Sequence, residues 1–198
     1  MQNWYDILFI DIFDLFPRLI VRVRGVLVGF FRGLHFYKLG SSIKIRGSRY
    51  IFLGERVSVG DFCWIEAVTH FAGKRFSPRL ELGDGVSLSN FTHISCVSHI
   101  RIGDDCLIGS KVYIGDHSHG STLDISEIFS ISPANRPLGD ISPIVIGKNS
   151  WICDGAVILA GTKLANNSII GANSVVRLQT DRAAVIAGAP AKVIKYLE

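Results

Sequence analysis

Branched aliphatic residues recur at every sixth position in the C-terminal part of the chain. The series is Ile146, Ile152, Ile158, Leu164, Ile170 and Val176, and a small residue stands four positions after each of the first five. Neither the 3.6-residue period of a helix nor the two-residue period of a half-buried strand gives this spacing. A six-residue period is typical of a parallel β-helix, in which each repeat forms one flat face of a prism. We therefore predict an all-β fold with stacked aliphatic side chains inside the coil.

The same period is present earlier in the chain, with interruptions. It starts near Leu53, is broken at residues 70–78, and gains two residues between Ile94 and Ile114. Residues 116–143 leave the repeat altogether. A long irregular excursion from a regular scaffold is where functional residues tend to lie. We predict a plain loop at 70–78 and an extended active-site loop at 116–143.

The N-terminal residues 1–40 differ from the repeats and are predicted to form a separate helical segment before a β-helix domain over 41–198. Their apolar residues favour helices over Asn3–Phe16 and Pro17–Leu34, because proline suits the first turn of a helix. Charged residues keep every uncharged run shorter than the ~20 residues that a spanning helix needs.

Two interpretations of this helical segment remain open. It caps the open end of the coil or contacts another subunit, or residues 1–34 form a basic amphipathic segment on the inner face of the cytoplasmic membrane. At the other terminus, the basic residues that end at Glu198 are predicted to form a short C-terminal helix.

Composition limits the classes of function. The 198-residue chain has a net charge of +4, which is compatible with an anionic ligand but too small to indicate nucleic-acid binding. Its four cysteines form no CxxC pair, which favours structural thiols in a reducing compartment. The N-terminus lacks the basic start of a cleavable signal peptide, so we expect a cytoplasmic protein.

Two histidines open the long excursion, in the run Asp116-His117-Ser118-His119-Gly120. Histidine is the side chain best suited to take a proton from a hydroxyl near neutral pH, so a general base is expected here. A loop histidine without a role is the alternative. No further cluster of ligands supports a metal, and none is expected. If the two extra residues of the preceding coil follow His99, this third histidine lies one coil below His119 and orients it.

Together, several motifs resemble those of the left-handed β-helix, or hexapeptide-repeat, acyltransferases. The resemblance spans about residues 45–195 and is strongest to maltose and galactoside acetyltransferases and to O-acetyltransferases of bacterial surface polysaccharide. The motifs that carry it are the Asp116–Gly120 run, Asn135-Arg136-Pro137-Leu138, Ile146-Gly147-Lys148-Asn149-Ser150-Trp151-Ile152, Ile170-Gly171-Ala172-Asn173-Ser174-Val175-Val176 and Ala187-Gly188-Ala189-Pro190.

The resemblance implies a left-handed coil, a homotrimer with active sites between subunits, and acetyl-CoA as co-substrate. It matches the family's catalytic histidine to His119 rather than His117. The positions that it matches to the CoA-binding groove are Trp151, Asp154, Ala172, Asn173, Arg177 and Lys192. Acceptor contacts are matched loosely at Asn90, and we also expect Arg136 to contact the acceptor or hold the loop. The acid that usually precedes the catalytic histidine by one coil is missing, since Cys96, Val97 and Ser98 occupy that stretch.

The resulting hypothesis is an acetyl-CoA-dependent O-acetyltransferase that acts on a sugar hydroxyl of a bacterial surface polysaccharide or its precursor, with His119 as general base. The alternatives are N-acetylation of a nucleotide-linked amino sugar, or acetylation of a small soluble sugar or xenobiotic. A different class of function is a β-helix that has lost catalysis and serves as a binding module. An intact His119 and CoA-groove motifs argue against that last alternative.

Overall fold

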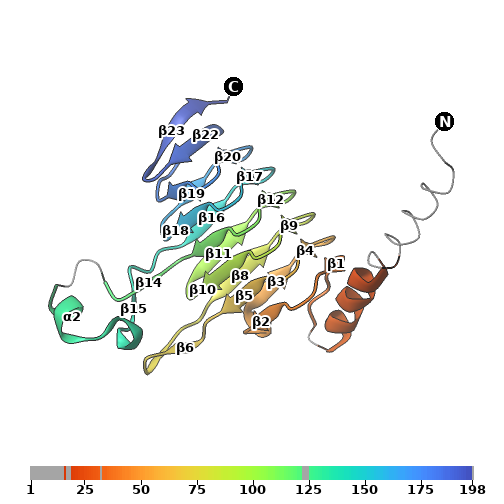
Figure 1. Ribbon diagram of the computed structural model, residues 1–198, viewed down its shortest axis with the longest axis horizontal. Coiled ribbons are helices and arrows are strands. Elements are labelled where there is room, and N and C mark those ends of the chain that lie inside the picture. Colours follow the sequence, from red (N-terminus) through yellow and green to blue (C-terminus); the bar gives the residue numbers. More distant parts are fainter. Residues whose placement is uncertain (1–15, 17–18, 32, 122–124, 198) are drawn as a thin grey trace, which may run out of the picture.

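The computed structural model describes residues 16, 19–31, 33–121 and 125–197. Its main body is a three-sided parallel β-helix, in which each turn of the chain adds one strand to each of three sheets (Figure 1). Sheets A, B and C follow one another along each coil, so a strand of A leads to one of B and then to one of C. The parallel β-helix predicted from the repeat is confirmed, and the coil is left-handed, as the resemblance implied.

The elements have the following bounds. Sheet A consists of β1 (Lys38–Leu39), β4 (Ser58–Val59), β9 (Ser87–Leu88), β12 (Leu107–Ile108), β17 (Trp151–Ile152), β20 (Ile169–Ile170), β22 (Ala184–Gly188) and β23 (Ala191–Tyr196). Sheet B consists of β2 (Lys44–Arg46), β5 (Trp64–Ala67), β10 (His93–Cys96), β13 (Tyr113–Gly115), β18 (Val157–Leu159) and β21 (Val175–Val176). Sheet C consists of β3 (Ile51–Leu53), β8 (Arg79–Leu82), β11 (His99–Ile102), β16 (Ile144–Ile146) and β19 (Lys163–Leu164). A 3-10 turn, η1 (Ser48–Tyr50), precedes β3.

The core of the prism is the aliphatic series read from the sequence. Each of its six members from Ile146 to Val176 is at most 2% exposed. The small residues four positions later are buried too, and their hydroxyls bond the backbone: Ser150 Oγ donates to the carbonyl of Gly147 at 2.7 Å. A larger side chain at such a corner would have no room in a close-packed interior. The six-residue period therefore reports both the stacked aliphatics and the tight corners.

Two insertions leave the prism at the corner between sheets B and C, and both project to the same side (Figure 1). We predicted a plain loop for the first insertion, but it forms a hairpin of β6 (His70–Phe71) and β7 (Lys74–Arg75). The second contains β14 (Ser118–His119), α2 (Ile125–Ser130), η2 (Pro133–Asn135) and β15 (Leu138–Gly139). Because β14 pairs antiparallel with β15, the excursion returns to the coil where it left it.

The N-terminal helix covers residues 19–31 within the predicted Pro17–Leu34, while the predicted Asn3–Phe16 helix lies outside the described residues apart from Phe16. Its glycines face the chain: a Cβ at Gly25 would collide with the carbonyl of Phe36, and one at Gly29 would lie 2.6 Å from the His35 ring. Its large apolar side chains face outward, among them Phe30 at 82% exposure.

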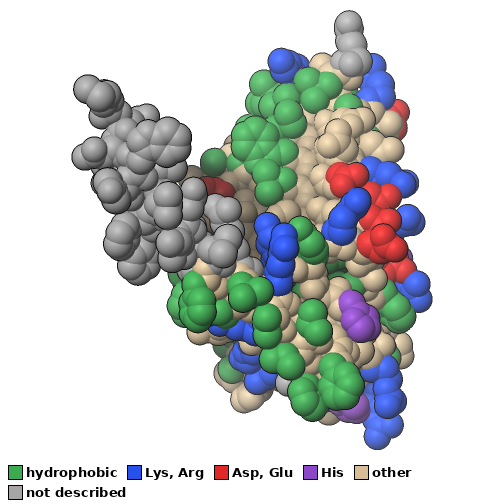
Figure 2. All heavy atoms as spheres, turned by 90° about the vertical axis from the view of Figure 1, so that its right-hand side faces the viewer, with side chains coloured by type: hydrophobic (Ala, Val, Ile, Leu, Met, Phe, Trp, Pro, Cys, Tyr) green, Lys and Arg blue, Asp and Glu red, His purple; other side chains and the backbone are tan. Residues whose placement is uncertain are grey.

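Figure 2 views this side of the molecule, where hydrophobic side chains lie beside Lys and Arg in the lower part of the face. None of the helices in the described part of the chain has the length and apolar character needed to cross a bilayer.

The predicted C-terminal helix is wrong. The residues form β23, which pairs antiparallel with β22 on the last coil. Ala191 and Val193 pack against the core while Lys192 and Ile194 face outward, which is the two-residue period of a strand. This strand covers an edge of the coil whose backbone would otherwise stay unpaired.

Candidate active site

The largest gathering of chemically active side chains lies in a cavity of about 350 Å³ between sheet B and the two insertions. Sheet B supplies its floor, the hairpin supplies one wall and the long excursion supplies the other. The cavity is lined by Trp64, Glu66, Val68, Phe71, His93, Ser95, Tyr113, His117, Ser118, His119 and Leu138. The structure thus places both His117 and His119 in the lining of one cavity.

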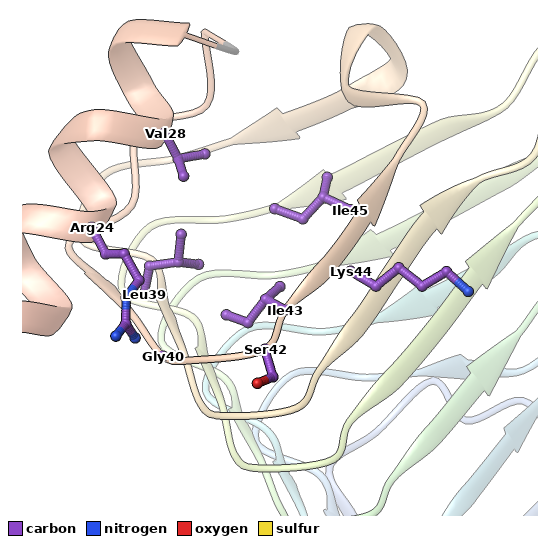
Figure 3. A pocket seen from close by; sticks show the side chains of 8 residues that line it. All are labelled: Arg24, Val28, Leu39, Gly40, Ser42, Ile43, Lys44 and Ile45. Carbon is purple, nitrogen blue, oxygen red and sulfur yellow. The ribbon is translucent and has the colours of Figure 1, made fainter.

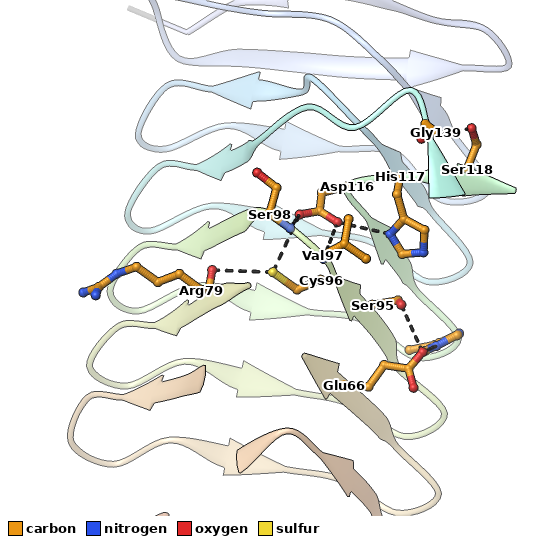
Figure 4. A network of polar contacts seen from close by, with 11 residues as sticks. Glu66, Arg79, Ser95, Cys96, Val97, Ser98, Asp116, His117, Ser118 and Gly139 are labelled. Carbon is orange, nitrogen blue, oxygen red and sulfur yellow. Dashed lines mark hydrogen bonds and ion pairs between the residues drawn. The ribbon is translucent and has the colours of Figure 1, made fainter. Parts of the chain in front are cut away.

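A buried carboxylate holds the start of the excursion (Figure 4). Asp116 is fully buried and accepts hydrogen bonds from the backbone N–H groups of Val97 and Ser98, both at 2.8 Å. Its Oδ1 also lies 3.1 Å from Nδ1 of His117. An ionised carboxylate can only accept, so Nδ1 of His117 carries a proton and Nε2 is the nitrogen with a free lone pair. Asp116 therefore fixes both the loop and one imidazole.

The second histidine stands further out. His119 is exposed, and the edge of its ring contacts Phe71 of the hairpin, with ring centroids 5.2 Å apart. Its backbone is fixed by the pairing of β14 with Leu138 of β15. Phe71 comes from the stretch that we predicted to be a plain loop, and sequence spacing alone gave no sign that it would reach His119.

The floor of the cavity was missed by the sequence analysis, which gave no role to Trp64, Glu66 or His93. The Trp64 and His93 rings stack in parallel at 4.4 Å. Glu66 accepts a hydrogen bond from Ser95 Oγ at 3.0 Å and lies 3.9 Å from His93 Nε2. Burial alone would raise the pKa of Glu66, but its contacts with His93 and Ser95 outweigh burial and leave the pKa below its ordinary value. Glu66 is therefore an ionised carboxylate in the cavity floor.

Close packing also shapes the upper part of this floor. A side chain at Gly115 would collide with the hydroxyl of Tyr113, which leans over this residue. The sequence could have suggested this contact, because Tyr113 and Gly115 lie two residues apart on one face of a strand.

The predicted role of His99 is wrong. His99 lies on sheet C and its Nε2 is 3.1 Å from Glu81 Oε2, and it does not line the cavity. The two extra residues of this coil lie at the corner between β10 and β11, before His99 rather than after it. The ring therefore belongs to the next face of the prism, beyond the reach of His119.

The residues matched to the CoA groove lie elsewhere in this chain. Trp151 is 49% exposed on sheet A. Asp154 and Asn173 follow it at the corner between sheets A and B, in successive coils: Asn173 N–H donates to the Asp154 carbonyl at 3.0 Å, and Asp154 Oδ1 accepts from Ser110 N–H at 2.7 Å. Within one chain, this edge of sheet B is opposite the edge that carries His119.

The remaining predicted positions have these places. Ala172 precedes Asn173 at the same corner, Arg177 follows β21 and is exposed, and Lys192 lies outward on β23. Asn90 lies at a corner between sheets A and B, at the opposite edge of sheet B from the insertions, and it does not line the cavity. Its Oδ1 accepts a hydrogen bond from the Asp61 N–H at 2.9 Å. Arg136 Nε donates to the carbonyl of Ile131 at 2.8 Å, so this side chain holds the loop, one of its two predicted roles.

None of the four cysteines lines the cavity that contains His119, although Cys96 Sγ lies 3.6 Å from Asp116 Oδ2. Cys63, Cys96 and Cys106 are buried, and burial raises the pKa of each thiol, for Cys96 to about 12 with a further contribution from the charge of Asp116. Such thiols stay protonated and are poor nucleophiles. Across the part of the chain that the structure describes, no group of three His, Cys, Asp or Glu side chains could hold a metal ion.

Sequence comparisons place the repeats among bacterial transferases. Residues 143–177 match the family model described as bacterial transferase hexapeptide (six repeats), and residues 99–115 match the hexapeptide repeat of succinyl-transferase. The chain is 42% identical over 114 residues to WbbJ of Escherichia coli, a putative lipopolysaccharide biosynthesis O-acetyl transferase. This alignment covers 57% of the chain and only 58% of WbbJ.

A second relative matches over almost the whole chain. WcaF of Escherichia coli, a putative colanic acid biosynthesis acetyltransferase, is 26% identical over 197 residues, which are 98% of this chain and 86% of WcaF. Among solved structures, a variant of AntD, an N-acyltransferase from Bacillus cereus in complex with dTDP and coenzyme A, superposes with a TM-score of 0.60. It is 17% identical, with 80% of this chain and 83% of AntD covered, so this similarity concerns the fold alone.

Proposed function

We propose that the chain is a hexapeptide-repeat, left-handed β-helix acyltransferase, and within that family an acetyl-CoA-dependent O-acetyltransferase for a sugar of a bacterial surface polysaccharide or its precursor. The observation that carries the proposal is the cavity in which His117 and His119 face the polar floor of sheet B. The names of WbbJ and WcaF supply the acceptor class.

His119 is the general base in this proposal. It lies on the outer wall of the cavity, where its exposed ring is open to an acceptor hydroxyl, whereas the side chain of His117 is 7% exposed and held by Asp116. The family motif matches the same residue. His117 is then a positioned ring that shapes the back of the cavity, with Nε2 directed away from its carboxylate partner.

The reaction needs one proton transfer in each direction. His119 takes the proton of the sugar hydroxyl as its oxygen attacks the thioester carbonyl, and backbone N–H groups stabilise the resulting oxyanion. The carbon–sulfur bond then breaks, and the CoA sulfur leaves with the proton from His119. Transfer is direct in this proposal, because the pKa of each of the four cysteine thiols is raised by burial and none of them lines the cavity beside His119.

A trimer completes the site. Within one chain the residues proposed for the CoA groove, from Trp151 to Lys192, lie on sheet A, on the A–B edge or near the last coil, away from His119. Packing the A–B edge of one chain against the B–C insertions of its neighbour places these two sets in one cleft. Arg177 and Lys192 are exposed cations suited to the phosphates of CoA.

The N-terminal helix supports peripheral contact with the anionic inner face of the cytoplasmic membrane. It directs small glycines toward the protein and large apolar side chains outward, with Phe30 and Phe31 at 82% and 78% exposure. Residues 15–54 contain no Asp or Glu, and their cations are Arg18, Arg22, Arg24, Arg32, Lys38, Lys44, Arg46 and Arg49. Exposed apolar groups among cations favour binding to anionic lipid.

The membrane contact is tested by vesicle co-sedimentation of the full chain. Wild-type protein is expected to sediment with vesicles that contain anionic lipid and to bind zwitterionic vesicles less. A Phe30→Ser, Phe31→Ser variant should lose most of this binding and keep its trimer. Equal binding of wild type and variant, or no binding by either, contradicts the membrane contact.

The activity is tested by release of the CoA thiol from acetyl-CoA with a panel of bacterial glycans, with the product identified by mass spectrometry. His119→Ala should lower kcat by about 10²–10⁴-fold and leave the oligomeric state and CoA binding unchanged. His117→Ala is the matched variant and should retain more activity. An active His119→Ala enzyme with an inactive His117→Ala enzyme moves the role of base to His117. Transfer to an amino sugar instead of any hydroxyl contradicts the O-acetyltransferase.

A further inference from the structure

A row of outward side chains runs down sheet B from the active-site cavity to the first coil. The strand register pairs Lys44 with Trp64, Trp64 with His93, and His93 with Tyr113 in successive coils. The side chains follow this register. Lys44 Nζ lies 3.7 Å from the Trp64 ring centroid, the Trp64 and His93 rings are stacked, and His93 contacts the Tyr113 ring edge-on at 5.2 Å.

Two polar atoms of this row are buried without a hydrogen bond, although one of them, His93 Nε2, lies 3.9 Å from Glu66 Oε1. They are Nε1 of Trp64 and Nε2 of His93, the only such side-chain atoms among the described residues. Both residues line the cavity that contains His119. A buried polar atom without a hydrogen bond is unfavourable, so a small shift of either ring that brought its nitrogen to a ligand hydroxyl would be favoured.

The chemistry of the floor defines what it would bind. Lys44 and His93 cover the two faces of the Trp64 ring, so Trp64 has no free stacking surface and only the edge of its ring borders the cavity. The Glu66 carboxylate lines the same cavity and can accept hydrogen bonds from hydroxyl groups. A few polar groups, among them a carboxylate, in a cavity otherwise lined largely by apolar and aromatic surface suit the hydroxyl groups and the apolar face of a sugar ring.

Below this floor the surface becomes cationic. Arg46 lines a hollow of about 200 Å³ together with Glu66 and Val68, two residues that also line the active-site cavity. Lys44 and Arg24 are both among the lining residues of a pocket of about 460 Å³ under the N-terminal helix, and the Lys44 side chain points away from that helix (Figure 3).

Neither Lys44 nor Arg46 forms an ion pair with any carboxylate that the structure describes, and both are exposed. Arg46 stands opposite Glu66 in the register, but its guanidinium leans toward the Trp64 ring, 5.9 Å from the centroid. Their charges are therefore available to an anion.

We infer that the acceptor is a glycosyl phosphate or diphosphate, with its sugar against Trp64, His93 and Glu66 and its phosphate against Arg46 and Lys44. The inference rests on the proposed acetyl transfer and specifies its acceptor. Three strand steps separate β13, where the excursion to His119 begins, from β2, where the two cations lie. At roughly 4.8 Å a step this is about 14 Å, so the reacting hydroxyl and the phosphate occupy opposite ends of one elongated acceptor.

The subsite is tested first by binding, without any transfer reaction. Inorganic pyrophosphate and a nucleoside-diphosphate sugar are titrated into the full chain by calorimetry, in the absence of acetyl-CoA. A Lys44→Ala, Arg46→Ala variant should bind both about tenfold or more weakly, since charge-assisted hydrogen bonds to phosphate are lost. Lys163→Ala is the matched control, because it removes an exposed cation from sheet C and should bind as the wild type does. Equal pyrophosphate affinity in the double variant and the wild type overturns the inference.

Kinetics then separate the acceptor from the reaction. The same sugar is offered as a nucleoside-diphosphate sugar, as a polyprenyl-diphosphate sugar in detergent, and as an uncharged methyl glycoside. The inference expects at least one phosphorylated form to have a higher kcat/KM than the glycoside, and the double variant to lose this preference while its KM for acetyl-CoA is unchanged. Which phosphorylated form reacts identifies the carrier.

A preference for the uncharged glycoside overturns the inference and leaves the acetyltransferase intact. If no acceptor is acetylated but pyrophosphate binding depends on the two cations, the proposed reaction fails and the anion subsite stands.

Discussion

The loss of Asp116 should destabilise the protein more than the removal of one surface charge can. This carboxylate is fully buried and accepts the backbone N–H groups of Val97 and Ser98. An Asp116→Ala substitution leaves both donors without an acceptor at the corner between β10 and β11. With about 1–3 kcal/mol for each buried unpaired group, the expected loss is about 2–6 kcal/mol in the free energy of unfolding.

An intermediate variant makes this prediction sharper. Asp116→Asn keeps one oxygen that can accept one N–H, but its amide NH₂ faces the other donor. The free energy of unfolding of this variant should therefore lie between those of the wild type and Asp116→Ala. The control is Asp181→Ala, which removes an exposed carboxylate and should change stability by less than about 0.5 kcal/mol.

The assay is chemical denaturation of the three variants and the wild type, all at one protein concentration because oligomers unfold in a concentration-dependent way. Midpoints and slopes together give the free energies. A loss below about 1 kcal/mol for Asp116→Ala would refute the reasoning, because it would mean that the two N–H groups find other partners or water.

Three further predictions follow from the same structure. The folded pKa of Glu66 lies below its ordinary 4.5, so the ionised carboxylate stabilises the fold fully above that pH and loses this effect as the pH falls through the folded pKa. The difference in the free energy of unfolding between wild type and Glu66→Gln should therefore become smaller in acid. A difference that stays constant with pH contradicts this. Arg177→Ala and Lys192→Ala should each raise the KM for acetyl-CoA more than they lower kcat, and unchanged KM in both places the cofactor elsewhere. Ile158→Ala, at 0% exposure in the middle of the stack, should cost about 2–5 kcal/mol in thermal or chemical unfolding, and a cost under 1 kcal/mol would mean that the coil collapses around the cavity.

The sequence predicted the scaffold because its rule is local and repeated. One branched aliphatic every six residues, with a small residue at each corner, is visible without knowing any contact, and Ile146 to Val176 follow it throughout. The place of the excursion that contains His117 and His119 follows from the same rule, since the excursion is where the period fails.

The floor of the cavity could not be predicted in this way. Side chains that point out of the prism follow no repeating pattern in the sequence. Trp64, Glu66 and His93 lie close together because strands of successive coils pair in a particular register, and this register depends on coil lengths that differ. His99 was misplaced for the same reason, because a two-residue insertion moves a side chain to the next face depending on which side of it the insertion falls. The C-terminal residues were misread because a short basic segment suits either a helix or a strand until an unpaired edge is available to it.

Both insertions leave the prism at the same corner, two coils apart, and the coil continues past each of them. The parallel ladder resumes beyond each insertion, with β8 paired to β3 and β11, and β16 paired to β11 and β19. The strand pairing of the coil therefore does not depend on the residues of the hairpin or of the excursion. Exchanging residues 70–75 for another turn would leave the three sheets of the coil unchanged while it alters the opening of the cavity above sheet B, so the shape of the cavity is free to evolve independently of the scaffold.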